Sequence, residues 1–165
     1  MEIRNVCVAD TEAIAAIRRQ DGVREKILAL SSERDAVTED FIRSLADCDR
    51  GFTAVRDGEV VGFGVLLRNR EPNRAHCASV AVMVDGDCHG MGIGHALLKR
   101  ITQEADNVLK LHRLELLVLV DNKNAIKIYR DFGFCTEAVK RHAAVVNGKF
   151  VDEFLMGRIK AEDSK

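Results

Sequence analysis

Residues 89–94 read His-Gly-Met-Gly-Ile-Gly, and they separate a stretch typical of a β-strand from one typical of an α-helix. The preceding stretch, Ala75–Val84, is rich in valine and alanine, which favours a strand. From Ile93 onward, apolar residues recur every three or four positions and predict one helix face: Leu97, Ile101, Ala105 and Val108. Alternating glycines at a helix start leave N–H groups free at the positive end of its dipole, so the loop predicts a phosphate or pyrophosphate site. The alternative is a turn that needs glycine only for its backbone dihedrals.

Outside this stretch, the apolar residues alternate between the periods of strands and helices. They predict seven strands, at Ile3–Val8, Phe52–Val55, Val60–Leu67, Ala75–Val84, Leu114–Val120, Cys135–Val145 and Phe150–Ile159. They predict four helices, from an Asp10 N-cap to Arg19, at Thr38–Ala46, from Ile93 and at Asn124–Phe132, with Asp21–Val37 as loop or irregular helix. Hairpin turns are expected at Asp57-Gly58 and Asn147-Gly148. This order predicts an α/β (α+β) domain with a mixed sheet and a central β-α-β-α unit.

The composition predicts one domain over residues 1–165, because 47% hydrophobic and 31% charged residues suffice for both a core and a solvated surface. The net charge of -1 provides no global positive field, so we expect no nucleic-acid and no membrane partner. The N-terminus carries Glu2, Arg4 and Asp10 where a signal peptide would be apolar. Together these features predict a soluble, cytoplasmic protein.

The five cysteines are odd in number and include no CxxC pair, which indicates neither a disulfide framework nor a zinc site. We therefore expect buried thiols in a reducing compartment. The dipeptides His76-Cys77 and Cys88-His89, together with His95, show no established ligand spacing, so we expect no metal.

Three kinds of phosphate-binding loop compete for the glycine-rich stretch. A P-loop needs Lys-Ser or Lys-Thr after its last glycine, but His95-Ala96 follow Gly94. A dinucleotide fingerprint needs glycines at spacings of two and then three, which neither Gly90 nor Gly92 begins. The third kind, a coenzyme A pyrophosphate loop, predicts a second motif further along the chain.

That second motif is present, and with it the sequence resembles the GNAT superfamily of acetyl-CoA-dependent N-acetyltransferases. The family pattern [Arg/Gln]-x-x-Gly-x-[Gly/Ala] is met by Gly92 and Gly94, with His89 in place of Arg or Gln. About thirty residues later, the family's Asn-x-x-Ala-x-x-x-Tyr and Gly-Phe are met by Asn122, Ala125, Tyr129 and Gly133-Phe134. The resemblance covers essentially the whole chain. It implies a mostly antiparallel seven-stranded sheet flanked by about four helices.

The resemblance also implies roles for individual residues. The strand before the loop would bond the pantetheine arm through its main chain around Val82, Met83 and Val84. The pyrophosphate would lie on the loop residues His89, Gly90, Met91, Gly92, Ile93 and Gly94, with the His89 contact weakened or left to the backbone. Asn122 would contact the cofactor, or else only cap a helix. Tyr129 would donate a proton to the departing thiolate, or else only pack in the core.

The activity implied is direct transfer of the acetyl group from acetyl-CoA to a primary amine. A closer resemblance, carried by Val118–Tyr129 and Val146–Asp152, is to bacterial enzymes that acetylate free L-amino acids. Polyamine or protein acetylation, a non-catalytic acyl-CoA sensor and a nucleotide-binding protein are the alternatives. No carboxylate lies on Ala75–Val84, so the general base stays open among His76, Ser79 through water, Asp152 and Glu153. By family habit the chain is expected to form a homodimer.

Overall fold

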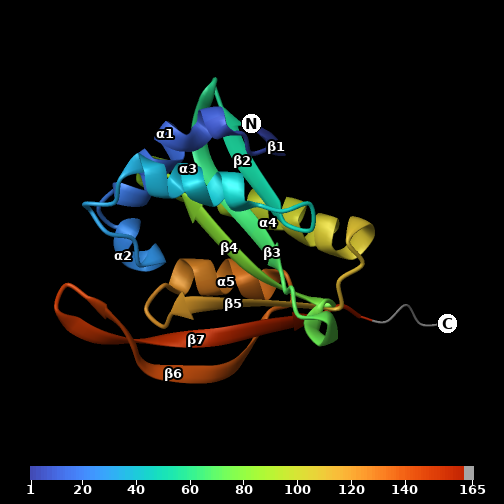
Figure 1. Cartoon of the computed structure of the whole chain (residues 1–165). Helices are drawn as coiled ribbons and strands as arrows, with labels where there is room; N and C mark the ends of the chain where they lie inside the picture. Colours follow the sequence, from blue (N-terminus) through green and yellow to red (C-terminus); the bar gives the residue numbers. More distant parts are fainter. Residues whose placement is uncertain (162–165) are drawn as a thin grey trace.

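The computed structural model describes residues 1–161, and its seven strands form one mixed sheet in the order β1-β2-β3-β4-β5-β7-β6 (Figure 1). The strands are β1 (Glu2–Asn5), β2 (Arg50–Arg56), β3 (Glu59–Arg68), β4 (Cys77–Val84), β5 (Arg113–Leu119), β6 (Cys135–Val146) and β7 (Lys149–Ile159). Only the β4–β5 pair is parallel among these described strands, and the other five pairs are antiparallel. The predicted mixed, mostly antiparallel sheet is therefore confirmed.

Five α-helices lie in the described residues: α1 (Thr11–Arg19), α2 (Arg24–Ile27), α3 (Asp35–Ser44), α4 (Ile93–Gln103) and α5 (Lys123–Asp131). The sequence predicts about four, and the extra one is α2, a single turn inside the stretch predicted as loop or irregular helix. A four-residue helix has no periodic apolar face, so no sequence pattern indicates it. The helix predicted from Ile93 is α4, and after Gln103 it continues into a π-helical turn over Glu104–Val108.

Asp10 is the N-cap residue of α1 as predicted, but its carboxylate is used elsewhere. Its side chain makes no capping bond to the helix. Instead the carboxylate accepts hydrogen bonds from the Arg4 guanidinium at 2.6 and 2.8 Å, from the Cys7 backbone N–H at 2.9 Å and from the Thr53 hydroxyl at 3.1 Å. This buried carboxylate therefore ties the entry to α1 onto β1 and β2.

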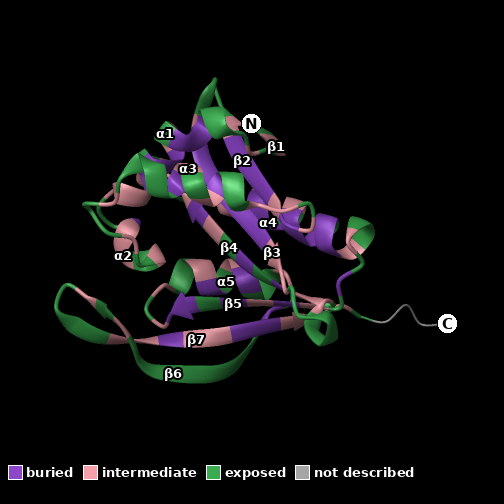
Figure 2. Cartoon of the chain, in the orientation of Figure 1, coloured by how far each residue is buried: buried purple, intermediate pink, exposed green. Residues whose placement is uncertain are grey.

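The sheet has a separate apolar cluster on each face. One cluster joins the sheet to α4 and α5 and includes Leu97, Ile101 and Tyr129, and the other joins it to α1 and α3 and includes Ile14 and Ile42. Figure 2 shows this burial along β3 and α4, whereas β6 at the sheet edge is exposed over most of its length. The helices thus cover the β1–β4 side of the sheet on both faces.

Two glycines of β3 let α4 approach the sheet closely. A Cβ atom added at Gly64 would lie 2.9 Å from Ile101 Cδ1, and one added at Gly62 would lie 3.1 Å from both Leu97 Cδ1 and the Met83 carbonyl oxygen. Because such distances are below ordinary contact, α4 packs on the backbone of β3. This packing fixes the start of α4, and with it the glycine loop, beside the end of β4.

The two parallel strands separate soon after they meet. Pairing between β4 and β5 covers only Cys77–Ser79 and Arg113–Glu115. Beyond it, β4 stays paired with β3 as far as Val84, and β5 stays paired with β7 as far as Leu119. The strands diverge towards their carboxyl ends, where α5 follows β5 (Figure 1). A wedge therefore opens in the middle of the sheet.

The five cysteines carry free thiols, and the prediction that they are buried is wrong, because none of them is fully buried. Cys7 and Cys135 are exposed, while Cys48, Cys77 and Cys88 are half-buried. In residues 1–161 no helix is long and apolar enough to cross a membrane. The organisation as one domain over residues 1–165 stays a prediction, supported by the single sheet, and residues 162–165 lie outside the described part.

Candidate active site

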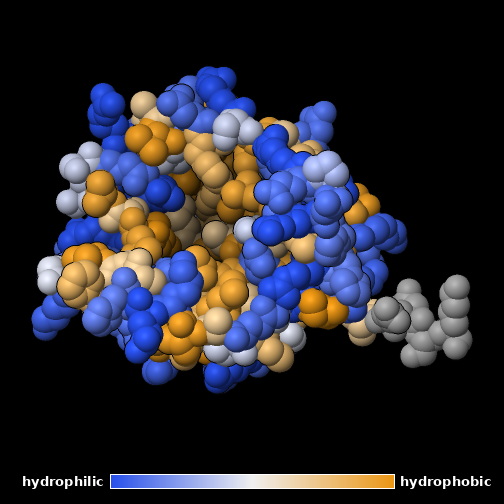
Figure 3. Space-filling view, turned by 60° about the horizontal axis from the view of Figure 1, so that its bottom comes forward, coloured by the Kyte–Doolittle hydropathy of each residue, from blue (hydrophilic) through white to orange (hydrophobic). Residues whose placement is uncertain are grey.

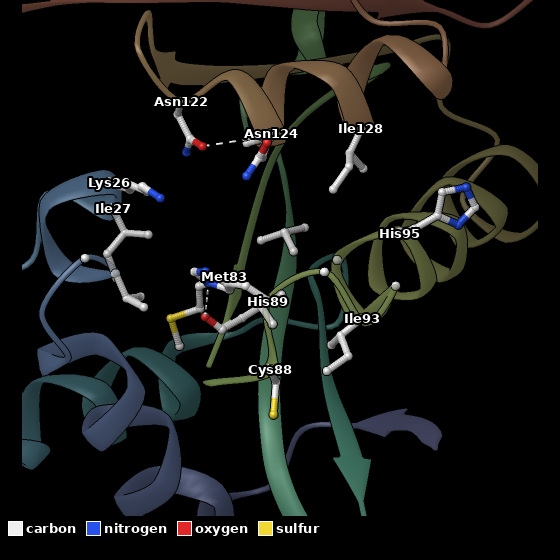
Figure 4. Close-up of a pocket in the computed structure, with 18 of the residues that line it drawn as sticks. Lys26, Ile27, Met83, Cys88, His89, Ile93, His95, Asn122, Asn124 and Ile128 are labelled. Carbon is white, nitrogen blue, oxygen red and sulfur yellow. Dashed lines mark hydrogen bonds between the residues drawn. The ribbon is translucent and has the colours of Figure 1, made fainter. Parts of the chain in front are cut away.

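A cavity of about 340 Å³ occupies the wedge between β4 and β5. Its walls come from the end of β4, the glycine loop, the first turn of α4, one face of α5 and, from the opposite side, α2. Figure 3 shows a hollow with largely hydrophobic walls surrounded by hydrophilic residues. Figure 4 shows side chains from these separate segments converging on one space.

The glycine loop adopts the backbone that its sequence predicts. Gly90 and Gly92 both have φ +78°, in the left-handed region that favours glycine, and Gly92 is the N-cap of α4 without a side-chain cap. The first backbone bond of the helix runs from the Ala96 N–H to the Gly92 carbonyl at 3.0 Å. The N–H groups of Ile93 and the next two residues therefore have no acceptor within the helix. These N–H groups lie at the positive end of the dipole of α4, a setting that suits an anion.

Nearly all of the loop residues predicted to bind the cofactor line this cavity. They are His89, Gly90, Gly92, Ile93 and Gly94. Met91 is the exception, since its side chain is 51% exposed and contacts Arg56 outside the cavity. Any contribution of Met91 to the site is therefore restricted to its backbone.

The junction between β4 and the loop is held by hydrogen bonds that the sequence does not reveal. The Gln20 amide donates to the Asp85 carboxylate at 3.0 Å and accepts from the Gly86 N–H at 2.8 Å, which ties the end of α1 to this junction. The His89 imidazole Nε2 lies 3.2 Å from the Val84 carbonyl oxygen. Since a carbonyl only accepts, Nε2 carries the proton in this contact. The ring of His89 thus rests on the strand end.

The strand residues Val82, Met83 and Val84 line the cavity, but their side chains lie on two faces of the sheet. Val82 and Val84 pack against the cluster of α4 and α5, whereas Met83 is buried in the cluster of α1 and α3. Because β4 has left β5 by this point, its backbone groups on the cavity side are not engaged by β5. An extended amide-bearing ligand fits such a strand edge.

Asn122 begins α5, and its side chain has the capping role given as the alternative. Its amide oxygen accepts from the Ala125 N–H at 3.4 Å, as the dashed line in Figure 4 marks. The same residue also lines the cavity, so capping and lining are both observed.

Tyr129 lies on α5, about two helical turns after Asn122. Its side chain is 7% exposed. Its ring packs with the Phe134 ring at a centroid distance of 5.9 Å, and it also lines the cavity. Burial raises the pKa of the Tyr129 phenol to about 12. In the described part of the chain, no residue makes a hydrogen bond to this hydroxyl. The phenol is therefore protonated at neutral pH and available as a donor.

None of the four candidate bases from the sequence lines the cavity. His76 lies at the far end of β4, near the His112 ring, and Ser79 lines a separate hollow beside Glu115. The Asp152 carboxylate accepts from the His142 N–H at 2.8 Å, and the Glu153 carboxylate lies 3.6 Å from the Lys140 ammonium. The tertiary structure thus assigns these groups to other contacts.

Sequence reasoning did not place several lining residues: Gly22, Val23, Lys26, Ile27, Cys88, His95, Asn124, Ala125 and Ile128. Helical spacing from Asn122 and Tyr129 could have indicated Ala125 and Ile128, because these residues share one face of α5. For the α2 segment, the family resemblance implies a part in the acceptor pocket, but no local pattern shows which of its residues reach the cavity, since about sixty residues separate them from the rest of the site. In residues 1–161, no group of three or more His, Cys, Asp or Glu side chains is arranged to hold a metal ion.

Comparison with known proteins agrees with this geometry. The family model described as "Acetyltransferase (GNAT) family" matches residues 15–134, which include the glycine loop, Asn122 and Tyr129. The chain belongs to the acetyltransferase (GNAT) family. It is accordingly an enzyme of acetyl transfer, and this family uses acetyl-CoA.

Relatives within the GNAT family act on different amines. The chain is 34% identical to the L-amino acid N-acetyltransferase AaaT of Escherichia coli K12, over 96% of this chain and 97% of that protein. It is 29% identical to the spermidine N(1)-acetyltransferase of the same strain, over 62% of this chain and 54% of that protein. The likeness to AaaT therefore covers the ends of the chain as well as the cofactor region.

Solved GNAT structures share the fold. The structure of yncA from Salmonella typhimurium with its cofactor acetyl-CoA has a TM-score of 0.85 at 19% identity, over 100% of this chain and 96% of that one. The ribosomal-protein-alanine N-acetyltransferase from Brucella melitensis has a TM-score of 0.84 at 22% identity, over 97% and 100%. At these identities the comparison establishes the fold alone.

Proposed function

We propose that this protein transfers the acetyl group of acetyl-CoA to the primary amine of a free L-amino acid. The observation that carries the proposal is the cavity between β4 and β5, because it joins an anion-binding helix start, an open strand edge and a buried phenol in one space. The full-length likeness to an L-amino acid N-acetyltransferase supports the acceptor class.

The cavity suits the shape and charge of acetyl-CoA. The free N–H groups at the start of α4 would hold the pyrophosphate, and the left-handed Gly90 and Gly92 turn the backbone towards it. Neither glycine has an atom within 4 Å of an added Cβ, so their role is conformational. The edge of β4 at Val82 and Val84 would bond the pantetheine amides, and Asn122 would border the same arm.

The substrate supplies an activated thioester, and the protein supplies orientation and a proton donor. The neutral amine nitrogen attacks the carbonyl carbon and a C–N bond forms. The C–S bond then breaks, the sulfur leaves with the electron pair, and the nitrogen loses one proton to solvent. Tyr129, which lines the same cavity, would donate a hydrogen bond to that sulfur. With its pKa near 12 the phenol is a weaker acid than a thiol of pKa about 8.5. A strong hydrogen bond to the departing sulfur is therefore favoured over full transfer of the proton.

The attacking amine must be neutral, and no aspartate or glutamate is among the described residues that line the cavity. We propose that the amine loses its proton to solvent before attack. The value of kcat/KM should then rise with pH towards the pKa of the acceptor amine, about 8–10 for an alkyl ammonium.

An acceptor screen tests the proposal directly. Thiol release from acetyl-CoA is measured with free L-amino acids, with spermidine and with peptides that begin with alanine. The proposal predicts turnover with at least one free amino acid, at a higher kcat/KM than with spermidine or peptide. Preference for spermidine or peptide would overturn the acceptor class. Binding of CoA without turnover would indicate a sensor, and binding of ATP or NAD without CoA binding would indicate a nucleotide-binding protein.

The homodimer stays a prediction. Light scattering on the purified chain should give twice the monomer mass of 18.3 kDa if the prediction holds.

A further inference from the structure

The segment around α2 carries charged side chains of both signs, but only one of them lines the cavity. Residues 24–35 carry three cations and three carboxylates: Arg24, Lys26, Arg34, Glu25, Glu33 and Asp35. Arginine or lysine in the site would suit a carboxylate-bearing acceptor, whereas aspartate or glutamate would suit a polyamine. Of these six residues, the structure brings Lys26 alone to the wall of the cavity.

Ion pairs outside the cavity occupy the three carboxylates. The Glu33 carboxylate binds the Arg18 guanidinium at 2.8 Å, and Asp35 pairs with Arg19. The Glu25 carboxylate lies 3.0 Å from the Arg24 guanidinium and accepts from the Gly22 N–H at 2.7 Å. Negative charge in this segment is thus neutralised locally and directed away from the cavity.

Lys26 differs from these residues in both position and pairing. Within the described residues its ammonium has no carboxylate within ion-pair distance. Figure 4 shows the side chain reaching from α2 into the open space, with Asn124 of α5 on the opposite side. The base of the segment is fixed, since Val23 is 4% exposed in the cluster of α1 and α3 and Ile27 packs against the same cluster. The ammonium is therefore presented from an anchored turn.

We infer that Lys26 binds the α-carboxylate of the acceptor and so selects amino acids over amines without a carboxylate. The inference rests on the proposed function. A charge-assisted hydrogen bond from the ammonium would hold the carboxylate on the α2 side, while the amine of the same α-carbon faces the thioester. A polyamine would bring a second positive charge to this wall, where Lys26 repels it.

The test compares one acceptor with and without its carboxylate. The kcat/KM for L-leucine is divided by that for L-leucinamide, both at saturating acetyl-CoA, in the wild type and in Lys26→Ala, Lys26→Glu and Lys26→Arg. Any general effect on cofactor binding cancels in this ratio, because both acceptors use the same acetyl-CoA complex. If another amino acid is the best acceptor in the screen, that amino acid and its amide take the place of the leucine pair.

Loss of the ammonium should lower the acid-to-amide ratio by roughly tenfold or more, the effect of one hydrogen bond to a charged group. Lys26→Glu should lower it further, and Lys26→Arg should keep most of it. Arg34→Ala serves as the matched control, since Arg34 is a cation of the same segment that does not line the cavity. Its ratio should equal that of the wild type.

Three negative results have different meanings. An unchanged ratio in Lys26→Ala, with leucine still acetylated, would overturn the role of Lys26 and leave the proposed function intact. A rise in the KM for acetyl-CoA with no change in the ratio would instead assign Lys26 to the cofactor. Failure of the wild type to acetylate any free amino acid would overturn the proposed function, and the inference with it.

Discussion

Ser79 on β4 and Glu115 on β5 form the last pair in the parallel ladder, and the two strands part beyond them. Every group assigned to the cofactor lies past this pair, on the strand ends, the glycine loop or α5. The site therefore exists because β4 and β5 stop pairing with each other. Backbone N–H and C=O groups that are not paired across the two strands can form hydrogen bonds to a ligand instead.

Tyr129→Phe should reduce kcat by about 100-fold, because the variant removes the hydrogen bond to the departing sulfur and keeps the ring that packs on Phe134. Steady-state kinetics measure kcat, and calorimetry with CoA should give an affinity near that of the wild type. Unchanged thermal unfolding serves as the control for packing. Near-normal turnover in this variant would exclude Tyr129 as the donor.

Gly92→Ala should weaken CoA binding, because alanine resists the φ of +78° that directs the loop N–H groups. The expected destabilisation is about 1 kcal/mol, since no atom lies within 4 Å of the added Cβ and the cost is conformational. Gly148→Ala is the matched control: its φ is +75°, its Cβ also meets no atom within 4 Å, and it lies in the β6–β7 turn. Equal loss of stability with unequal loss of CoA affinity is the expected pattern. Equal CoA affinity in both variants would argue against the loop as the pyrophosphate site.

His89→Arg should tighten CoA binding severalfold. The imidazole of His89 is occupied by the Val84 carbonyl at 3.2 Å, whereas a longer guanidinium can reach phosphate oxygens bidentately. Calorimetry with CoA measures the effect, and pantetheine, which lacks the pyrophosphate, is the comparison ligand. Its affinity should not rise. A parallel gain for pantetheine would mean that the variant acts on the strand end and not on the phosphates.

Asp10→Asn should destabilise the fold at neutral pH by about 1–2 kcal/mol. Burial alone would raise the pKa of the Asp10 carboxyl, but hydrogen bonds from Arg4 and from the Cys7 backbone outweigh it and lower the pKa to about 2. Because the folded-state pKa lies below the ordinary value of 3.8, this contribution is present above pH 4 and is lost as the pH falls towards 2.

Urea unfolding at a series of pH values tests this prediction. The difference between the wild type and Asp10→Asn should shrink from pH 4 to pH 2, while the exposed Asp40→Asn should stay near the wild type throughout. A difference that persists at pH 2 would assign the effect to packing and not to charge.

Much of the fold could be predicted because it depends on neighbouring residues. The Asp57-Gly58 and Asn147-Gly148 turns have positive φ at both positions, as the sequence indicates, and they join β2 to β3 and β6 to β7. The spacing of apolar residues located α4 and α5 to within a few residues. The N-cap position at Asp10 was predicted, but the carboxylate makes no capping bond because Arg4 on β1 and Thr53 on β2 bind it instead.

In the candidate site too, some features follow from the local sequence and others only from the tertiary structure. The sequence by itself determined the glycine loop and the position of Tyr129 on α5, because backbone dihedrals and helical spacing are local properties. It left the Asn122 cap as an alternative to a cofactor contact. Only the tertiary structure decided that β4 and β5 separate after Ser79 and that His89 rests on Val84. It also decided that Lys26, and none of its charged neighbours, lines the cavity. Those features depend on packing between segments far apart in the chain, which no local pattern encodes.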